Sequence, residues 1–512
     1  MSLATISSRA ILGIEAVAVT VETHLSNGLP GFAIVGMPET AVRESKERVR
    51  SAIINAGLEF PERRITVNLA PADLPKAGGQ YDLAIAMSIL LASSQVPKAS
   101  LEAVEIMGEL ALDGTLRRIG GAVPALLAAR EQGRAIVLPS ANQAELDLVA
   151  YSRAFGVTNL LQYVDHLKTG AELPQPDMAR AAPEKPCATP LRFLEIKGQL
   201  VARRAIQIAA AGRHNLLLVG PPGCGKTMLA QNLTRLLPPL TEHEAMEVAA
   251  IRSISRPGIG ASPMQWRPLR TPHHSATHVA LVGGGNRANP GEITLAHRGV
   301  LFLDEFTEFK PAALDALRES LETGEVTVSR ANYRIDYPAD FQLVAAMNPC
   351  PCGYATDPAR ECRCSADKVS RYLGKLSGPL LDRIDLLLEL PSLTHAELLQ
   401  QQQPESNDQT EWHQASERVR HCHKLQRKRA GKLNYRLDSD ELELYCKLSK
   451  PLRKLMAKTM EDLGLSARAV HRVQKVARTI ADFEQSESIE KQHLLEAISY
   501  RRSNVLSRLV QA

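Results

Sequence analysis

The sequence has no uninterrupted apolar run of the about 20 residues that a transmembrane helix needs, which argues against a membrane-spanning protein. Its first residues, Met1 to Ala10, lack the charged and apolar regions of a secretory signal. Only eight cysteines occur among 512 residues, too few for a disulfide scaffold. We therefore expect a soluble, cytoplasmic protein with reduced thiols and no membrane partner.

The chain also lacks a large net charge of either sign. The formal net charge of +5 is small for this length, so it neither requires nor excludes a nucleic-acid partner, and any basic surface must be local. The chain is too long for one hydrophobic core, and its apolar content of 44% is ordinary for a globular protein. We therefore expect two or three domains.

The residue pattern divides the chain into four segments. Residues 1–170 alternate short β-branched runs such as Ile65–Leu69 with helical stretches such as Thr40–Ala56, which predicts an α/β domain. Residues 171–190 hold five prolines and few apolar side chains, which predicts a linker. Residues 191–395 return to alternating strands and helices.

The fourth segment, residues 396–512, follows a polar run from Gln400 to Asp408 that is typical of a surface loop. Its apolar spacing predicts an all-helical domain. The expected helices are Glu411–Arg429, Ser439–Lys447, Arg453–Leu463, Ala467–Phe483 and Ile489–Tyr500.

A strand, a glycine-rich loop and a helix follow one another near position 220. Leu216–Val219 is a short apolar run typical of a buried parallel strand, and Met228–Leu237 continues as a helix. The loop between them matches the phosphate-binding pattern: Gly220, Pro221, Pro222, Gly223, Cys224, Gly225, Lys226 and Thr227. Its backbone N–H groups would surround the β-phosphate of ATP, Lys226 would reach the β- and γ-phosphates, and the Thr227 hydroxyl would ligate Mg²⁺.

Two further apolar runs end in residues suited to ATP hydrolysis. Val300–Leu303 is followed by Asp304, which would complete the Mg²⁺ shell, and by Glu305, which would polarise the attacking water. Gln342–Met347 ends at Asn348, whose amide could touch the γ-phosphate or orient the water. Two acids at a strand end can also be simply solvated, but the nearby phosphate loop favours the catalytic interpretation.

Hydrolysis also needs positive charge near the transferred phosphoryl group, and an arginine from a neighbouring subunit is a common source. Arg383 precedes an apolar strand and is the first candidate. Arg468 opens a helix in the last segment and is a candidate second sensor, with Arg472 one turn later as the alternative. Each arginine could instead form a surface salt bridge of little energetic value.

Several of these stretches resemble a known family. Pro290–Gly299 and Leu380–Asp385 are similar to the magnesium-chelatase and MCM-helicase branch of AAA+ proteins. Gly31–Glu39 and Arg270–His274 extend the resemblance, nearly end to end, to the bacterial YifB/ComM family of magnesium-chelatase-like ATPases. The resemblance implies an AAA+ P-loop NTPase core with a parallel sheet, a helical C-terminal lid and a homohexameric helicase. It further implies that the helicase drives branch migration when transforming DNA is integrated.

Two elements are candidates for the central channel of such a ring. Glu325–Tyr337 alternates as two short strands, and the resemblance implies that the hairpin carries a basic residue into the channel. Arg330 matches that position, with Arg334 nearby. A second stretch, Arg267–Asn289, holds His273 and His274 and resembles an insertion loop that also lines the channel. Hairpin arginines are often merely solvated, so the residues alone leave DNA contact open.

The leading interpretation is an ATP-driven translocase of single-stranded and branched DNA. The alternative is a chelatase-type remodeller that acts on a protein partner, which an aromatic pore residue such as Tyr333 would favour. One basic cluster could contact phosphates or could be a solvated helix face: Lys424, Arg427, Lys428, Arg429 and Lys432.

Four of the eight cysteines fall within fifteen positions: Cys350, Cys352, Cys362 and Cys364. Two close pairs of thiolates can bind one Zn²⁺ tetrahedrally, although the C-x-C spacing is tighter than the usual C-x₂-C. The alternative is a loop of unligated thiols. We expect a structural zinc site, because four thiolates leave no open position for catalysis.

The first segment resembles the proteolytic domain of Lon protease, a ribosomal-S5-domain-2-like α/β fold, in Leu74–Asp82 and Met107–Gly121. The resemblance implies a serine nucleophile where Gln80 stands and a lysine where Val123 stands. A glutamine cannot act as the nucleophile and a valine cannot act as a base. We therefore expect a scaffold without the protease dyad, serving as a docking or DNA-guiding collar.

Overall fold

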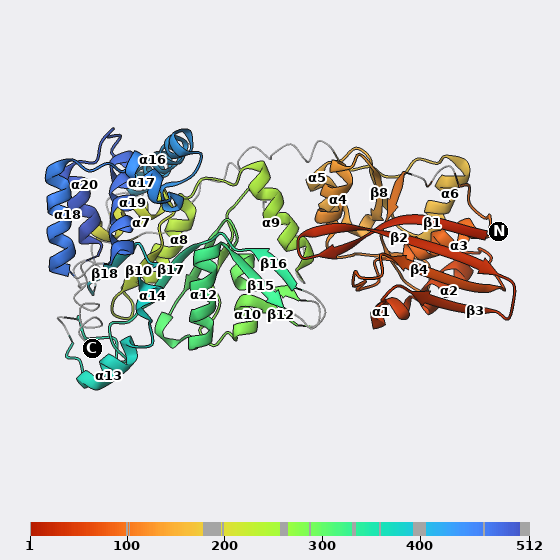
Figure 1. Cartoon of the computed structure of the whole chain (residues 1–512), viewed down its shortest axis with the longest axis horizontal. Coiled ribbons are helices and arrows are strands. Elements are labelled where there is room, and N and C mark those ends of the chain that lie inside the picture. Colours follow the sequence, from red (N-terminus) through yellow and green to blue (C-terminus); the bar gives the residue numbers. More distant parts are fainter. Residues whose placement is uncertain are drawn as a thin grey trace.

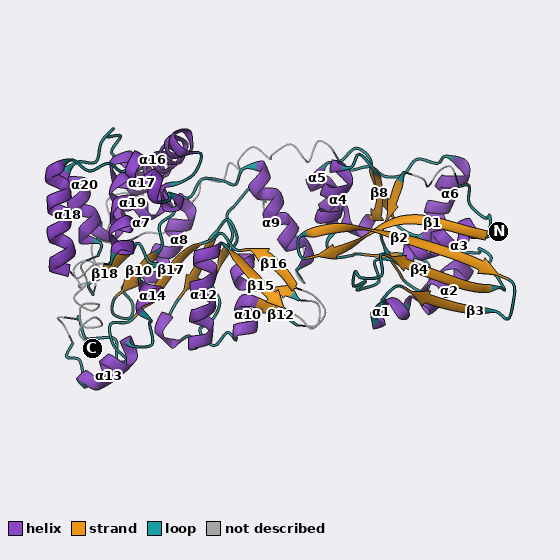
Figure 2. Ribbon diagram, viewed as in Figure 1, coloured by secondary structure: helices purple, strands orange, loops and turns teal. Residues whose placement is uncertain are grey.

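The computed structural model describes three regions of secondary structure along an elongated molecule (Figure 1). The N-terminal strands lie at one end, a parallel sheet lies in the middle, and an all-helical C-terminal part lies at the other end (Figure 2). None of the described helices is long and apolar enough to cross a bilayer. The described residues are 2–98, 101, 103–177, 196, 199–255, 265–285, 288–329, 334–357, 360–392, 406–463 and 466–501.

The N-terminal region is built on a mixed seven-stranded sheet in the order β3-β4-β2-β1-β5-β8-β9. Its strands are β1 (Ser2–Leu12), β2 (Glu15–Ser26), β3 (Gly31–Val35), β4 (Arg64–Ala70), β5 (Val104–Ile106), β8 (Ala135–Pro139) and β9 (Ala154–Val157). The helices of this region are α1 (Thr40–Arg43), α2 (Ser45–Asn55), α3 (Asp82–Ala92), α4 (Ala122–Glu131), α5 (Gln143–Val149) and α6 (Leu160–Thr169). The predicted strand runs are confirmed within longer strands, whereas the single helix predicted over Thr40–Ala56 is divided at Glu44 into α1 and α2.

The central region holds a five-stranded, all-parallel sheet in the order β11-β14-β17-β10-β18. The strands are β11 (Leu269–Arg270), β14 (Val300–Leu303), β17 (Gln342–Met347), β10 (Leu216–Val219) and β18 (Leu386–Glu389). β10, β14 and β17 are buried along their whole length, as expected for a parallel sheet covered on both faces. The predicted bounds of these three strands are confirmed.

Helices cover both faces of this sheet and short hairpins extend from it. The helices are α7 (Leu200–Gly212), α8 (Lys226–Leu236), α9 (Glu242–Ile254), α10 (His278–Val282), α11 (Glu292–Leu295), α12 (Pro311–Thr323), α13 (Ala366–Leu373) and α14 (Gly378–Leu381). β12 (Gly283–Gly284) pairs with β13 (Asn289–Pro290), and β15 (Glu325–Ser329) pairs with β16 (Arg334–Pro338) in antiparallel register. The predicted hairpin is therefore confirmed, although its tip, residues 330–333, lies outside the described residues.

The C-terminal region is helical, as predicted: α16 (Ser406–Ala430), α17 (Ser439–Tyr445), α18 (Lys450–Leu463), α19 (Ala467–Phe483) and α20 (Lys491–Ser499). Asp438 and Glu441 form a capping box that fixes the start of α17. Apolar residues of these helices share one buried core with α7, α8 and one face of the parallel sheet. The C-terminal helices α16–α20, called the lid below, are therefore packed onto the sheet.

The N-terminal region contacts the central region at two places. The backbone N–H of Gly121 donates to the carbonyl of Ser253 on α9 at 3.0 Å, and the N–H of Val123 donates to the Ser253 hydroxyl at 3.2 Å. The turn between β1 and β2 meets the hairpin β15–β16, where a Cβ on Gly13 would lie 2.7 Å from Ile335. A cavity of about 270 Å³ lies beside this second contact and is lined by residues of both regions.

A buried carboxylate ties the lid to the sheet. Asp340, just before β17, accepts from Arg298 at 2.7 Å and from Arg213 at 3.2 Å. From the lid side, Tyr435 donates to it at 2.7 Å and Arg436 pairs with it at 3.0 Å. Asp340 is only 7% exposed, so its charge is stabilised by these partners rather than by water.

Asp340→Asn should therefore lower the free energy of unfolding of the core and lid by about 3–5 kcal/mol, because it leaves the buried Arg213 and the partly buried Arg298 without this counter-charge. Urea and thermal unfolding would measure the loss. Glu308→Gln, a change in an exposed ion pair with Lys375, is the matched control and should change stability little. Equal stabilities of the two variants would contradict the role of Asp340.

The same change should alter the dependence of stability on pH. Burial raises the pKa of the Asp340 carboxyl, but the charges of Arg213 and Arg436 outweigh burial and hold this pKa well below its ordinary value. The carboxylate therefore stabilises the fold above the unfolded pKa of about 3.9 and loses this contribution as pH falls toward the folded pKa. The stability difference between wild type and Asp340→Asn should shrink below about pH 4.

Candidate nucleotide-binding site

The predicted phosphate loop connects the end of β10 to the start of α8. Gly223 and Gly225 adopt φ values of 81° and 85°, a left-handed conformation that favours glycine. Gly220 is needed for a different reason, since a Cβ there would lie 2.9 Å from the backbone oxygen of Leu390. The loop thus brings backbone N–H groups and the N-terminus of α8 to one point, an arrangement that suits a phosphate.

Lys226 and Asn348 meet at this point. The Lys226 ammonium donates to Asn348 Oδ1 at 3.2 Å and to the carbonyls of Gly220 and Pro221 at 2.8 and 2.9 Å. Asn348 follows β17, the neighbour of β10, and the N–H of Gly220 donates to the Met347 carbonyl at 3.2 Å. The residues predicted to bind and sense the γ-phosphate are therefore in direct contact.

The predicted Mg²⁺ ligands also lie together. The Thr227 hydroxyl donates to the Asp304 carboxylate at 3.4 Å, and both residues supply the hard oxygen atoms that Mg²⁺ prefers. Glu305, the next residue, has a left-handed backbone with φ 51° and ψ 47°. A non-glycine residue in this region is strained, and such strain is concentrated at functional sites.

The structure places His274 beside Glu305. Its Nδ1 lies 2.6 Å from a Glu305 carboxylate oxygen, and both side chains are partly exposed. The neighbouring His273 contacts the Ser275 hydroxyl through Nδ1 at 2.8 Å. Of the two histidines predicted to contact DNA, one therefore contacts the residue predicted to polarise water. Sequence reasoning missed this pair, because the two residues are far apart in the chain and no motif links them.

Arg383 lies at the opposite edge of the sheet. It precedes β18, and its carbonyl accepts from Asn215, which precedes β10. The phosphate loop follows β10, so the chain's own phosphate loop and Arg383 are at different ends of the same strands. The residue is 5% exposed, and its guanidinium pairs with Glu322 at 2.5 Å and donates to the Pro379 carbonyl. Glu322 was not identified from the sequence.

Arg472 and Arg468 differ in their surroundings. Arg472 donates to Asp385 at 2.6 Å and to the Arg383 carbonyl at 3.0 Å, so it holds the start of α19 against the sheet. Arg468 is exposed, and the hydrogen bond from Arg383, together with the charges of Arg383 and Arg468, holds the pKa of Glu322 below its ordinary value. Ser466, two residues before Arg468, donates to Asp382, the residue before Arg383, at 3.5 Å. Arg468 therefore lies near Arg383, at the sheet edge opposite the chain's own phosphate loop.

The described part of the hairpin carries one of its two predicted DNA contacts. Arg334 is exposed and bonds to Thr327 at 3.2 Å and Asp336 at 3.3 Å, both on the hairpin itself. Tyr337 is buried and donates to the Ala288 carbonyl at 2.7 Å, which connects the hairpin to the stretch after α10. Arg330, the other predicted contact, lies outside the described residues, as does Tyr333.

The basic cluster of the lid is largely used within the protein. Arg429 pairs with Asp482 at 2.7 Å, Arg427 with Glu244 at 3.1 Å and Lys432 with Glu441 at 2.7 Å. Lys424 and Lys428 are exposed. These internal pairs explain three of the five charges without a nucleic-acid partner.

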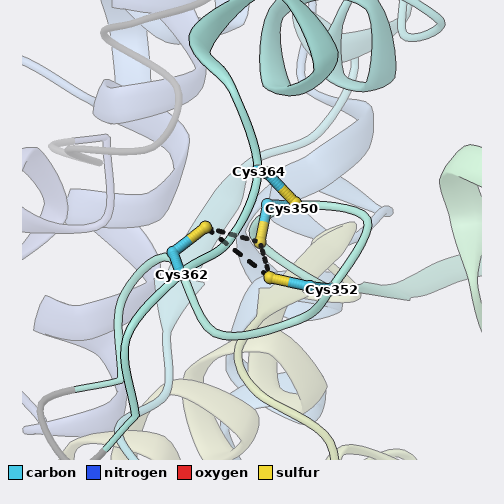
Figure 3. A group of neighbouring side chains, drawn as sticks. All are labelled: Cys350, Cys352, Cys362 and Cys364. Carbon is cyan, nitrogen blue, oxygen red and sulfur yellow. Dashed lines mark hydrogen bonds between the residues drawn. The ribbon is translucent and has the colours of Figure 1, made fainter.

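The four clustered cysteines face one another (Figure 3). Cys350 is fully buried, and its Sγ lies 3.3 Å from that of Cys352 and 3.6 Å from that of Cys362. All four sulfur atoms, that of Cys364 included, lie within 4.8 Å of one another. The backbone N–H of Tyr354 is the main cause that lowers the pKa of Cys352 to about 6. Burial instead raises the pKa of the Cys350 thiol, so the surroundings favour a thiolate at Cys352 and not at Cys350.

Models of the magnesium-chelatase family match three parts of the chain. The model described as magnesium chelatase, subunit ChlI, covers residues 192–398, which include the phosphate loop and the parallel sheet. The model described as subunit ChlI of Mg-chelatase covers residues 21–142, and the ChlI C-terminal model covers residues 409–501.

Similar proteins cover the chain from end to end. It is 47% identical to "Competence protein ComM" of Haemophilus influenzae over 100% of this chain and 99% of that protein. It is 47% identical to "Uncharacterized protein YifB" of Escherichia coli over 98% of this chain and 97% of that protein. Identity to the "Magnesium-chelatase 38 kDa subunit" of Cereibacter sphaeroides is 28% over 31% of this chain and 53% of that subunit. The chain therefore belongs to the YifB/ComM family of magnesium-chelatase-like AAA+ proteins.

Proposed function

We propose that this protein is a cytoplasmic, homohexameric ATPase that moves single-stranded and branched DNA and promotes branch migration during natural transformation. The contact between Lys226 and Asn348 at the mouth of the phosphate loop is the observation that carries the ATPase part. The DNA part draws support from the competence protein that is 47% identical over its length. In this proposal the channel hairpin β15–β16 connects the two activities.

The residues at the loop have distinct roles in ATP hydrolysis. Lys226 binds the β- and γ-phosphates, and Asn348 contacts the γ-phosphate or the attacking water. Thr227 and Asp304 would hold Mg²⁺, which neutralises phosphate charge when bound. Glu305 accepts a hydrogen bond from the attacking water and orients that water toward the γ-phosphate.

His274 links hydrolysis to the channel in this proposal. Its pairing with Glu305 at 2.6 Å occupies the carboxylate that would orient the attacking water. The stretch that follows leads through α10 to the Ala288 carbonyl bound by the hairpin. DNA that moves this stretch would separate the pair and release Glu305. DNA binding would then accelerate hydrolysis.

Arg383 and Arg468 act on the nucleotide of a neighbouring subunit. Both lie near Glu322, at the sheet edge opposite their own phosphate loop, so they are poorly placed to reach their own nucleotide. In a ring, that edge would face the phosphate loop of the next subunit. Glu322, whose side chain is 54% exposed, would release Arg383 when the neighbour's phosphate binds it.

The N-terminal region is a Lon-like scaffold without protease activity in this proposal. Gln80 lines the cavity beside the hairpin, while Val123 is fully buried against α9, so neither position offers a serine–lysine pair. Contact of the β1–β2 turn with Ile335 places this region against the channel hairpin, which suits a DNA-guiding collar.

Zinc is the second proposed metal. Cys350, Cys352, Cys362 and Cys364 supply four sulfur atoms at short mutual distances, a donor set that fits a closed structural Zn²⁺ site and leaves no position for a substrate.

The alternative function is remodelling of a protein partner, and the 28% identity to a magnesium-chelatase subunit favours it. The two functions differ in channel chemistry. Basic side chains such as Arg334 suit a phosphate backbone, whereas an aromatic tip would suit a polypeptide.

Three substitutions should separate the steps of ATP turnover. Lys226→Ala should weaken ATP binding by about tenfold or more, because a charged hydrogen-bond donor is lost. Glu305→Gln should retain ATP binding and lower kcat by about 10²–10⁴-fold. His274→Ala should raise hydrolysis in the absence of DNA. ATP binding and steady-state turnover of the purified protein measure all three.

Glu308→Gln is the matched control, since it makes the same exchange three positions from Glu305 in a residue that pairs with Lys375. It should behave as wild type. Rapid turnover by Glu305→Gln would show that Glu305 does not activate the attacking water. A slower DNA-free rate in His274→Ala would contradict the proposal that His274 restrains Glu305.

The channel proposal predicts a separation of function. Arg330→Ala combined with Arg334→Ala should keep the hexamer and the DNA-free ATPase rate but lose DNA stimulation and branch migration on a synthetic four-way junction. Cation–phosphate contacts release counterions, so the variant should also show weaker salt dependence of DNA binding. Arg453→Ala, on the exposed side of α18, is the control. Branch migration by the double variant at the wild-type rate would show that the hairpin does not grip DNA.

A further inference from the structure

Four cysteines follow β17 and Asn348 in the sequence. The turn at Gly353, between Cys352 and Cys362, contacts Pro222 of the phosphate loop. We propose that the Zn²⁺ bound by Cys350, Cys352, Cys362 and Cys364 clamps the phosphate loop against Asn348, so that ATP affinity depends on the metal. This inference rests on the zinc and nucleotide sites proposed above.

The sulfur positions fit a metal and do not fit disulfides. Zn–S bonds of about 2.3 Å in a tetrahedron place neighbouring sulfurs about 3.8 Å apart. The Cys350–Cys352, Cys350–Cys362 and Cys352–Cys362 distances are 3.3, 3.6 and 3.6 Å, well beyond the about 2.05 Å of a disulfide. Within the described part of the chain, this is the one group of three or more metal-ligating side chains that converges in this way.

The turn is folded tightly around its first two cysteines. The N–H of Gly353 donates to the carbonyl of Cys350 at 3.0 Å, and the N–H of Asp357 donates to the carbonyl of Tyr354 at 3.1 Å. The sulfurs of Cys350 and Cys352, on either side of Pro351, lie 3.3 Å apart. The conformation of the turn around Gly353 and the positions of the sulfurs that would hold the metal are therefore linked.

Gly353 presses this turn onto the phosphate loop. Its φ is 87°, and a Cβ added there would lie 2.7 Å from Pro222 Cδ and 3.9 Å from Asn348 Cγ. Only a residue without a side chain fits between the cysteine turn and Pro222. The position of the turn therefore limits where Pro222, and with it the phosphate loop, can lie.

The same turn sits two residues from Asn348. Cys350 is fully buried and holds the chain just after Asn348, whose amide oxygen accepts from Lys226. The cysteine cluster thus fixes both partners of the Lys226–Asn348 contact, Asn348 through the chain and the loop through Pro222. Without the metal, the four sulfur atoms would lose the bonds that tie the two cysteine pairs to one centre, and the turn would relax away from the loop.

The test uses full-length protein purified under reducing conditions without added metal. Zinc per chain is measured by elemental analysis, and ATP affinity is measured with a fluorescent ATP analogue in the absence of DNA. Wild type should carry about one zinc per chain. Cys364→Ser should lose most of the zinc and bind ATP about tenfold more weakly or worse, since small displacements of binding groups have effects of this size.

Gly353→Ala separates the clamp from the metal. It should keep its zinc but weaken ATP binding to a similar extent, because the added methyl group meets Pro222. Gly324→Ala is its matched control, since Gly324 also has a positive φ of 74° but has open space at the Cβ position. Cys187→Ser, in the proline-rich segment 171–190, controls for loss of a thiol far from the four cysteines in the sequence. Both controls should retain zinc and ATP affinity.

The outcomes are distinct. Wild-type protein without zinc would overturn the metal site. Wild-type ATP affinity in zinc-depleted Cys364→Ser or in Gly353→Ala would overturn the clamp and leave the zinc site standing. If Cys364→Ser fails to fold, Gly353→Ala and its control decide the clamp. A protein that moves no DNA would leave these results unchanged, because neither readout involves DNA.

Discussion

The nucleotide site depends on one constraint, the parallel direction of all five strands in the central sheet. Because the carboxyl ends of parallel strands meet at one edge, the residues that follow β10, β14, β17 and β11 come together at that edge. This edge brings Lys226, Glu305, Asn348 and His274 together. The opposite edge holds Arg383 and, through α19, Arg468. The parallel sheet therefore places the nucleotide-binding residues of each chain at one edge and Arg383 and Arg468 of the same chain at the opposite edge.

The surrounding parts fix this edge in different ways. Asp340, a buried carboxylate, holds the lid against the start of β17 by accepting from Tyr435 and pairing with Arg436. The cysteine turn presses on Pro222 from behind Asn348, and the hairpin contacts both Ala288 and the β1–β2 turn. In our account, the zinc ion, the DNA and the N-terminal region therefore all act on the residues around the phosphate loop. Each would change ATP turnover by small displacements of the loop, of Asn348 or of Glu305.

The parts predictable from the sequence are those governed by local pattern. β10, β14 and β17 are uninterrupted apolar runs, and their bounds match the prediction. Four lid helices have clear periodicity and begin and end within three residues of the prediction, whereas α16 begins at Ser406, inside the polar run predicted to be a loop. The phosphate loop has a strict local spacing, and its strand and helix lie where expected. Contacts between distant segments left no such pattern. The pairs His274–Glu305 and Arg383–Glu322 and the approach of Gly353 to Pro222 arise only from packing. The break at Glu44 was also missed, since both sides of it have helical periodicity.

The measurement that tests the central claim most directly is the ATP hydrolysis rate of the wild-type protein with and without forked DNA. The account predicts that forked DNA raises the rate several-fold or more, with stimulation that weakens as salt increases. A rate that forked DNA leaves unchanged, at a salt concentration where the DNA is bound, would contradict an ATP-driven DNA motor.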